Sequence, residues 1–395
     1  MYIAVLGPIA THELLSPAER QAGRAYPRGR EGAPLVSNLI REYLRQGHRV
    51  LALTHDDALP DDGPAFVHES GNLTYVVVPC RHHTFRPNGR RPGRTADFFR
   101  FERRQLVTQL RRYQPEVVHA HWTYEYALAG LQYDPKALVT THDNAWTIFR
   151  YVRTLNRFFH YLLARYVFWR GRHFTAVSSY TAGTVQPWAR VPVQIVPNPV
   201  QVPPRTNAPR GPLAMPVISM VVNGWDDHKN ITTALLAFKQ VRQQHPQAEL
   251  WGMGTAFEPG KQATVFCQRH NIEGVVLLGP TAHSQVLERV AASTLLLHTS
   301  IEESFGMALA EAMAYGVPVV AGQASGAVPW VVGPGGLLVD VHRPEAVAAA
   351  INQLLADPAL YEQLAAQAAT NVAERFPLAK VAGQYLALLQ AGPLG

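Results

Sequence analysis

The chain has 395 residues, of which 47% are hydrophobic, and it carries a formal net charge of +7. This length exceeds what one ordinary hydrophobic core supports, and it predicts two α/β domains. No apolar run approaches the roughly 20 residues that a membrane-spanning helix needs, so we expect no such helix.

Charge is unevenly distributed along the chain. Residues 1–200 contain 25 Lys+Arg and 15 Asp+Glu, a balance of +10, and the remaining 11 basic and 14 acidic residues give −3. A basic first half suits nucleic acid, an anionic membrane surface or an acidic substrate. Nucleic acid is the least favoured of the three, because zinc-finger spacing, an RNP-type aromatic motif and a heptad array are all missing from the sequence.

The first residues and the cysteines indicate the compartment. Met1–Gly7 is apolar but lacks a basic segment and a cleavage site, so it is predicted to be the first strand. Cys80 and Cys267 lie in different halves of the chain and are not expected to pair. We therefore predict a cytoplasmic protein, with peripheral contact to the inner face of the membrane as an open alternative.

The first half alternates strand and helix patterns in βαβ order. Strands are predicted at Tyr2–Leu6, Val50–Thr54, Thr74–Val78, Val117–His121, Ala137–Thr141 and Phe174–Val177, and helices at Leu35–Gln46 and Glu102–Arg112. The pattern stops near Val196, and seven prolines fall between positions 197 and 216. Such a density of proline is typical of an interdomain linker.

A second alternating series follows this linker. Strands are predicted at Val217–Val222, Ala248–Trp251, Val275–Leu278, Leu295–His298, Val317–Ala321 and Gly336–Val339, and helices at Thr232–Gln244, Pro344–Leu355, Leu360–Glu374 and Leu378–Leu389. We accordingly predict a first domain at 1–197, a linker at 198–216, a second domain at 217–375 and a terminal helical segment at 376–395.

Residues 303–314 form the most informative stretch, Glu-Ser-Phe-Gly-Met-Ala-Leu-Ala-Glu-Ala-Met-Ala. Its two carboxylates, Glu303 and Glu311, stand eight positions apart between two predicted buried strands. A helix is predicted to begin near Phe305, at the carboxyl end of the first of these strands. The N terminus of such a helix presents N–H groups and a positive dipole, which suit a phosphate.

This string resembles the Glu-x7-Glu motif of retaining glycosyltransferases of family 4, which have the GT-B fold. The match includes Ser-Phe-Gly after the first Glu, Glu-Ala-Met-Ala at the second and Gly-Val-Pro-Val-Val at 316–320. The alternative is an ordinary crossover helix with a surface Glu at each end. The resemblance implies two Rossmann-like, doubly wound domains that face an interdomain cleft, with the acceptor on the first domain and a nucleotide sugar on the second. It also implies that the segment 376–395 crosses back to the first domain.

The resemblance assigns roles to several residues of the second domain. Glu303 would be catalytic at the donor sugar and Glu311 would bind the ribose, with the donor also contacted by Ser304, Phe305, Gly306, Met307 and Gly224. Lys229 matches the Lys of a cationic clamp on the donor diphosphate; the alternative is a solvated surface lysine. The Arg of that clamp is not matched, since Asn223 or Trp225 stands in its place. His228 or an arginine of the first domain is a candidate for the missing charge.

Three histidines of the first domain end predicted strands. His142 matches a family His that faces the donor sugar and is assigned a catalytic role, with a structural role as the alternative. His119 and His121 resemble the family His-x-His element, and alternation places them on one side of their strand. We predict a structural or acceptor-facing role for this pair. A metal site is disfavoured because no Cys or acidic residue is adjacent in sequence.

Further acceptor-side features are less specific. Gly32 and Ala33 stand where the family often has Gly-Gly, so Gly32 is assigned to donor binding. Residues 8–30 form an insertion with four arginines that either folds over the acceptor or is a mobile surface loop. Residues 150–170 combine arginines and aromatics at helical spacing, which suits both core packing and a membrane interface with a lipid-linked acceptor. Arg150 is an acceptor-side candidate.

Taken together, the sequence predicts a retaining, metal-independent glycosyltransferase of hexosyltransferase type in polysaccharide or glycolipid biosynthesis. A UDP-sugar is the favoured donor, the acceptor is a glycan, a lipid-linked molecule or a small molecule, and no cofactor, metal or nucleic acid is expected. No Asp-x-Asp element occurs, so helix dipole, Lys229 and backbone N–H groups would stabilise the leaving group. The alternatives are a nucleotide-sugar epimerase of the same fold and a degenerate scaffold subunit. A dehydrogenase is poorer, because Gly252-Met253-Gly254 lacks a third glycine.

Overall fold

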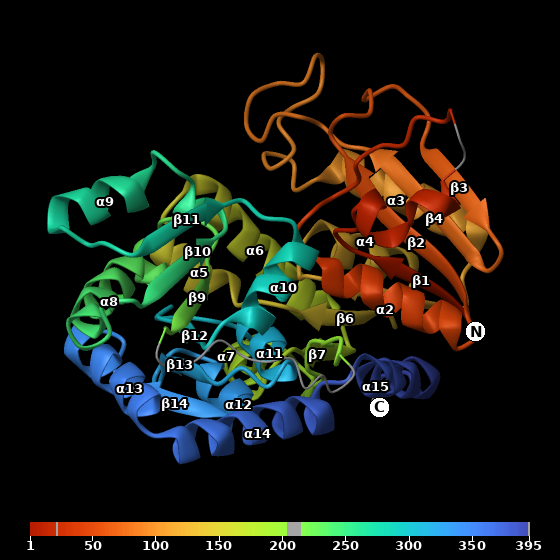
Figure 1. Cartoon of the computed structure of the whole chain (residues 1–395). Coiled ribbons are helices and arrows are strands. Elements are labelled where there is room, and N and C mark those ends of the chain that lie inside the picture. Colours follow the sequence, from red (N-terminus) through yellow and green to blue (C-terminus); the bar gives the residue numbers. More distant parts are fainter. Residues whose placement is uncertain (21–22, 204–214, 394–395) are drawn as a thin grey trace. The chain divides into compact units, whose positions relative to one another are not determined.

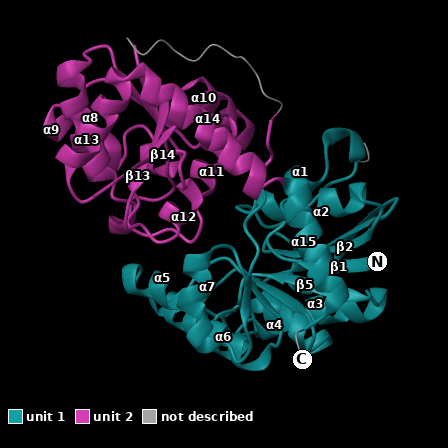
Figure 2. Cartoon of the chain, turned by 90° about the horizontal axis from the view of Figure 1, so that it is seen from below, with its two compact units in different colours: residues 1–199, 378–395 teal, residues 200–377 magenta. Residues whose placement is uncertain are grey.

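The computed structural model describes residues 1–20, 23–203 and 215–393 (Figure 1). The chain divides into two compact units, Met1–Pro199 with Leu378–Gly395 (unit 1) and Val200–Pro377 (unit 2), which Figure 2 colours separately. Positions 204–214 of the predicted linker lie outside the described residues.

Unit 1 contains one eight-stranded sheet in which every neighbouring pair is parallel except β3 with β4. In spatial order its strands are β3 (Phe66–Ser70), β4 (Leu73–Pro79), β2 (Arg49–Asp56), β1 (Tyr2–Leu6), β5 (Val117–His121), β6 (Leu138–Thr141), β7 (Phe174–Ala176) and β8 (Val193–Ile195). The order reverses between β1 and β5. Loops that leave these two strands diverge, which makes their carboxyl ends the expected ligand position of unit 1.

Helices cover the sheet of unit 1. They are α1 (Thr11–Leu14), α2 (Pro34–Arg45), α3 (Arg100–Tyr113), α4 (Glu125–Tyr133), α5 (Ala145–Tyr151), α6 (Leu155–Arg170), α7 (Ser179–Val185) and α15 (Leu378–Ala391), with 3-10 turns at Pro17–Glu19 (η1) and Gln186–Trp188 (η2). Strands β1 and β4 are buried at every position, as expected for strands with both faces covered. The C-terminal helix α15 contacts α2 and β5 through buried residues that include Val381, Tyr385 and Leu389.

Unit 2 contains a six-stranded, wholly parallel sheet. Its spatial order is β11 (Val275–Gly279), β10 (Glu249–Met253), β9 (Val217–Val221), β12 (Leu295–His298), β13 (Val319–Gly322) and β14 (Gly336–Val339). The helices are α8 (Ile231–Gln244), α9 (Gln262–His270), α10 (His283–Ala292), α11 (Met307–Ala314), α12 (Val328–Val332), α13 (Pro344–Ala356) and α14 (Pro358–Arg375), with 3-10 turns η3 (Asp227–Lys229) and η4 (Thr255–Phe257). The predicted pair of doubly wound α/β sheets is therefore observed.

One prediction of local structure was wrong, and one helix boundary is set more finely by the structure. Residues 150–170 are not one helix, because the chain leaves α5 after Tyr151 and re-enters α6 at Leu155, where the Thr154 side chain accepts a hydrogen bond from the Arg157 N–H. A Thr in this role ends one helix pattern and starts another. The helix predicted to begin near Phe305 begins at Met307, because Gly306 precedes it with a left-handed φ of 90°.

The inserted segment 8–30 is anchored to the sheet of unit 1 in its described residues. The Thr11 N–H donates to the Arg28 carbonyl, and the Gly29 N–H donates to Asp56 Oδ2 at the end of β2. Arg24 donates to the carbonyl of Val67 in β3. The segment therefore packs along β2, β3 and β4, and no side chain of positions 21–22 is described.

Candidate active site

The candidate donor site lies where the strand order of unit 2 reverses, between β9 and β12. The two strands pair in parallel through Ile218 with Leu295 and Ser219 with Leu296. Their carboxyl ends therefore lie side by side, and the loops that follow them carry Lys229 and Glu303. This is the position at which doubly wound sheets bind ligands.

The loops after β9 and β12 are joined by hydrogen bonds to backbone carbonyls. The Ile301 N–H donates to the His228 carbonyl at 2.7 Å, and the Thr299 hydroxyl donates to the Asn230 carbonyl at 3.0 Å. Asn230 has a left-handed φ of 50° and its side-chain amide donates to the Val341 carbonyl. These bonds fix the end of η3, and with it Lys229, beside the loop that carries Glu303.

Glu303 is the centre of this site. Lys229 Nζ donates to Glu303 Oε1 at 2.8 Å, and His298 Nε2 lies 3.5 Å from the same oxygen. Burial alone would raise the pKa of Glu303, but the hydrogen bond from His298 and the charge of Lys229 outweigh it and hold this pKa well below its usual range. Glu303 is therefore an anion at neutral pH, and its side chain keeps 20% exposure.

Sequence reasoning missed His298. It is the last residue of β12, is 6% exposed, and its Nε2 is directed at Glu303. The available signal was a polar residue that closes the otherwise apolar strand Leu295–His298. Its contact with Glu303 orients the carboxylate, which is how a buried histidine commonly supports an acid in a site.

The segment from Ser304 to Met307 shapes the start of α11. Phe305 is 2% exposed, with its ring 5.3 Å from that of Phe376 and 6.3 Å from that of Trp330. Its side chain therefore anchors the loop in the core, so only its backbone is placed to meet a donor. Gly306 takes a φ of 90°, which a side chain would strain. The N terminus of α11 that follows offers N–H groups to an anion.

Glu311 lies in α11, with its side chain 15% exposed. Its Oε1 is 2.8 Å from Nε2 of His283, the first residue of α10, whose side chain is 45% exposed. Sequence reasoning did not identify His283, which stands 28 positions from Glu311. The pair leaves a carboxylate and an imidazole at the surface of unit 2, where both can bind hydroxyl groups.

The loop after β9 is held by its neighbours. The Gly224 N–H donates to Thr255 Oγ1 at 2.9 Å, and the Thr255 N–H donates to Asn223 Oδ1 at 3.1 Å. Gly254 has a φ of 98°, and a Cβ there would lie 2.3 Å from the Val222 carbonyl oxygen. Gly252 and Gly254 thus serve close packing between β9, β10 and η4, in agreement with the low weight given to a dehydrogenase.

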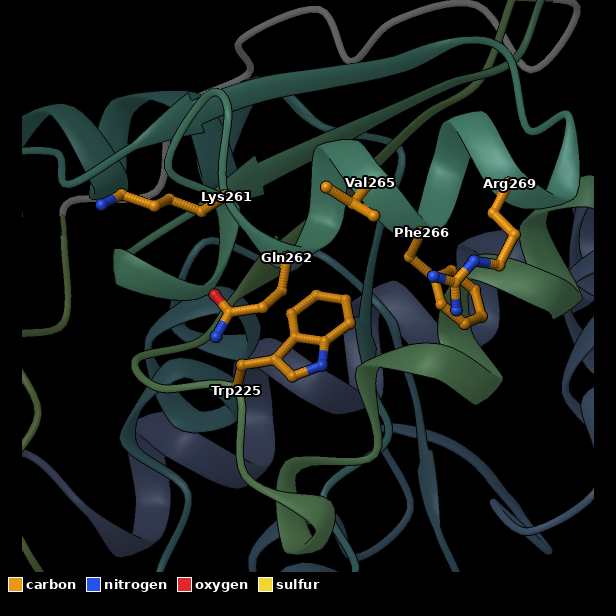
Figure 3. Close-up of a pocket in the computed structure, with 6 residues that line it drawn as sticks. All are labelled: Trp225, Lys261, Gln262, Val265, Phe266 and Arg269. Carbon is orange, nitrogen blue, oxygen red and sulfur yellow. The ribbon is translucent and has the colours of Figure 1, made fainter.

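Of the two residues that stand in place of the missing clamp arginine, Asn223 and Trp225, the second borders a surface hollow. Trp225 borders a hollow of about 450 Å³, whose other lining residues come from α9 and the residue before it: Lys261, Gln262, Val265, Phe266 and Arg269 (Figure 3). Its ring centroid lies 6.2 Å from that of Phe266. Burial, followed by the charge of Lys229, lowers the pKa of His228, so this histidine is mainly neutral at pH 7 and is a poor replacement for an arginine.

The three predicted histidines of unit 1 form one buried cluster at the ends of β5 and β6. His121 Nδ1 lies 2.9 Å from His142 Nε2, and the rings of His119 and His121 lie 4.2 Å apart. His119 Nε2 lies 2.8 Å from Thr140 Oγ1, and its ring lies 4.6 Å from that of Tyr385 in α15. Because His119 is fully buried among these groups, its placement favours the structural alternative over contact with an acceptor.

Burial has the same electrostatic effect on each of these histidines. It lowers the pKa of His119 and of His142 to about 3, and it lowers the pKa of His121 well below its usual value. All three are therefore neutral at pH 7. Gly7 follows β1 opposite His121, where an added Cβ would lie 3.2 Å from the His121 Cβ. Within the described residues, no group of three or more His, Cys, Asp or Glu is arranged to hold a metal ion.

The remaining predicted residues of unit 1, Gly32 and Arg150, are exposed. Gly32 is exposed with a φ of 101°, two residues before α2. Arg150 is exposed on α5, and its carbonyl accepts a hydrogen bond from Arg153. A pair that sequence reasoning missed, His55 at the end of β2 and Glu125 at the start of α4, is joined at 3.1 Å.

Comparisons with known proteins indicate the family of the chain. Residues 33–202 match the model of Glycosyltransferase Family 4, and residues 210–371 match that of Glycosyl transferases group 1. A segment of this chain is 38% identical over 118 residues to N-acetyl-alpha-D-glucosaminyl L-malate synthase of Bacillus anthracis. The match covers 29% of this chain and 30% of that protein. The matched segments span less than a third of the length of such curated relatives.

Solved structures show the fold over almost the whole chain. A sucrose-phosphate synthase from Thermosynechococcus elongatus superposes with a TM-score of 0.76 at 20% identity and covers 99% of this chain and 98% of its own. HepE of Anabaena in complex with UDP-glucose has a TM-score of 0.65 at 19% identity, with 99% and 100% covered. These likenesses confirm the predicted GT-B fold, and the two family models support a place in glycosyltransferase family 4.

Proposed function

We propose that this protein transfers a sugar from a nucleotide diphosphate donor to an acceptor. The GT-B fold and the match of both halves of the chain to glycosyltransferase models support this proposal. The observation that carries the proposal is the Lys229–Glu303–His298 cluster at the strand-order reversal of unit 2. It joins an anionic carboxylate to a cation beside a helix N terminus, which suits a sugar that develops positive charge and a diphosphate that leaves.

The proposed reaction proceeds with retention at the anomeric carbon. The bond from the anomeric carbon to the diphosphate oxygen breaks, the acceptor hydroxyl oxygen bonds to the same face, and its proton passes to the departing diphosphate. The ionised Glu303 stabilises the oxocarbenium-like sugar. Lys229 and the N terminus of α11 stabilise the departing diphosphate, and Glu311 binds the ribose. A UDP-sugar is the favoured donor because the structural relative HepE was solved with UDP-glucose.

The proposal names the acceptor only by its class. It is a glycan, a lipid-linked molecule or a small molecule. A lipid-linked acceptor would bring this protein to the inner face of a membrane as a peripheral protein. Within the described residues, no helix is both long and apolar enough to span a bilayer.

A thermal-shift screen of nucleotide sugars tests donor binding. A ligand at 100 times its Kd adds about 2.7 kcal/mol to the free energy of unfolding, so the matching donor should raise Tm by roughly 5 °C or more. Glu311→Gln should abolish most of this shift, whereas Glu362→Gln, at an exposed position of α14, should leave it unchanged. A screen in which no nucleotide or nucleotide sugar shifts Tm would contradict the proposal.

Metal independence is a separate prediction. The chain has no Asp-x-Asp element, and Lys229 with the α11 N terminus is placed to stabilise a diphosphate without an ion. Activity should therefore survive exhaustive EDTA treatment within about twofold, since no bridging ion would be removed. Loss of activity on chelation that Mg²⁺ or Mn²⁺ restores would show that the charge is stabilised by a metal instead.

An epimerase of the same fold remains the second candidate, because Glu303 and Lys229 would suit any reaction that cleaves the sugar–diphosphate bond. Incubation of the purified protein with the donor identified above distinguishes a transferase from an epimerase. Transfer predicts consumption that depends on an added acceptor. Conversion of the nucleotide sugar in the absence of an acceptor would favour the epimerase. A degenerate scaffold subunit would consume nothing under either condition.

A further inference from the structure

The outward face of α5 and α6 exposes an unusual amount of apolar surface (Figure 2 shows both helices at the edge of unit 1). Twelve large hydrophobic side chains are exposed in the described part of the chain, and seven of them are here. We define the α5–α6 face by these seven: Trp146, Tyr151, Leu155, Phe158, Leu162, Tyr166 and Trp169. Concentration of exposed apolar groups on one surface marks an interaction site.

On α6 the exposed residues follow helical spacing. Leu155, Phe158, Leu162, Tyr166 and Trp169 recur every three or four positions, which places them along one side of the helix. Another side of the helix is buried through residues 163, 164, 167 and 168. A surface helix normally turns a polar side to water. On α6 the exposed side is apolar as well as the buried one. Packing against the core explains the apolar residues of the buried side but not those of the exposed side.

Aromatic contacts make the α5–α6 face continuous. The Trp146 ring lies 5.1 Å from that of Tyr161, and the Phe149 ring lies 5.7 Å from that of Phe158, so α5 is joined to α6. At the other end of α6, Tyr166 stacks on Trp169 at 5.6 Å. These contacts therefore link exposed rings of α5 and α6 into one surface.

The ionised side chains on α5 and α6 themselves are all arginines. No Asp or Glu occurs between positions 144 and 225, whereas Arg150, Arg153, Arg165 and Arg170 are exposed on or beside α5 and α6. The loop 82–95 adds to the same surface. Its Phe85, 39% exposed, lies 5.9 Å from Phe159 of α6, and Arg86 and Arg90 in this loop are exposed.

We propose that the α5–α6 face binds the surface of an anionic phospholipid bilayer. Tryptophan and tyrosine side chains prefer the interface between headgroups and acyl chains, and arginines are attracted to anionic headgroups. A second copy of this chain is disfavoured as the occupant because it would bring the arginines of α5 and α6 together, and these two helices carry no Asp or Glu to pair with them. The proposal deepens the function proposed above, since it assigns the membrane contact of a lipid-linked acceptor to a named surface. It does not depend on the donor site.

Flotation of the full-length protein with vesicles tests this assignment. Vesicles of phosphatidylcholine alone are compared with vesicles that contain about a third phosphatidylglycerol, at low and at moderate salt. We expect flotation only with the anionic vesicles, and at least about fivefold less of it at moderate salt, because salt screens exposed charges. Absence of binding to anionic vesicles at low salt, or equal binding to both compositions, would overturn the proposal.

Two double variants examine the apolar and the basic parts of the face. Leu155→Glu with Trp169→Glu should reduce flotation about tenfold or more, and Arg153→Gln with Arg170→Gln should reduce it by a similar factor. The controls are Val265→Glu, at a position of unit 2 that is 49% exposed, and Arg111→Gln on α3; both should bind like the wild type. Unchanged Tm excludes misfolding. If the controls lose as much binding as the double variants, the α5–α6 face is not the contact.

Light scattering, which measures the oligomeric state, tests whether a second copy of the chain occupies the α5–α6 face instead. A wild-type dimer that the Leu155→Glu, Trp169→Glu variant converts to a monomer would assign the face to a second copy and overturn the membrane proposal. A monomer in both proteins supports it. Donor-induced thermal shifts are measured on the same variants. Because the α5–α6 face contains no donor residue, failure of flotation with intact donor shifts would leave the proposed transfer reaction standing.

Discussion

Glu303→Gln should lower kcat by roughly 10²-fold or more while the donor still binds. The amide keeps the size of the side chain and can still bond to His298 or Lys229, but it cannot supply the negative charge that these two groups hold in place. Positive charge develops on the sugar only in the transition state. Loss of the Glu303 carboxylate should therefore lower kcat more than it raises KM. Single-turnover rates and donor Kd, measured on the same preparation, separate the two effects.

The neighbouring carboxylate provides the control for Glu303. Glu302→Gln removes the same unit of charge from the same loop, and it should change kcat by less than about threefold if position rather than net charge matters. Glu311→Gln should instead weaken donor binding, because ribose contacts are the same in the ground state and the transition state. Identical kinetic profiles for the Glu303 and Glu311 variants would show that the two carboxylates do not divide their roles as proposed.

Unit 1 should lose stability as pH falls below 6.5, because its histidine cluster stays neutral. Burial holds the folded-state pKa of His119 and of His142 at about 3, whereas an unfolded histidine titrates near 6.5. Between these values the unfolded chain binds protons that the folded chain cannot bind. The stabilisation is therefore complete above pH 6.5 and is lost as pH falls. From pH 7 to pH 5 each histidine should cost roughly 2 kcal/mol of unfolding free energy.

Replacement of one member of the cluster isolates this effect. Denaturant unfolding of His142→Gln, followed from pH 7 to pH 5, should show a decrease in unfolding free energy that is roughly 2 kcal/mol smaller than that of the wild type. The amide can still bond to His121, so the variant keeps one contact of the cluster. His82→Gln is the control, because the His82 side chain is 73% exposed. Parallel pH profiles for His142→Gln and the wild type would refute a neutral, buried His142.

The fold class could be predicted from the sequence because apolar residues recur with clear strand and helix periods. These segments are separated at regular intervals by turn residues. Buried strands such as Tyr2–Leu6 and Leu295–His298 read directly as apolar runs. The short outer strands β3 and β8 were not predicted, since Phe66–Ser70 and Val193–Ile195 bury few of their residues and lack a clear alternation. The break between α5 and α6 was missed because arginines and aromatics continue across Thr154 with the same spacing.

Prediction of the site reached Glu303, Lys229 and Glu311 through motif resemblance and their places at strand ends. It did not reach the partners of these residues. Lys229 and Glu303 are 74 positions apart, and nothing in their local patterns indicates that they form an ion pair. His283 was missed for the same reason, since it stands 28 positions from Glu311. His298 lies close to Glu303 in sequence, and its overlooked signal was a polar side chain at the end of an apolar strand. Such contacts are properties of the assembled sheet.

The C-terminal helix α15 has a consequence for biosynthesis. It supplies Tyr385 to the histidine cluster of β5 and packs on α2, although both of these elements are made long before α15. Unit 1 therefore cannot complete its core until α15 has left the ribosome, whereas all of Val200–Pro377 emerges earlier. Domains usually fold in the order of synthesis. In this chain the second unit can finish first, and the surfaces of α2 and β5 that α15 covers would stay open to solvent in nascent unit 1.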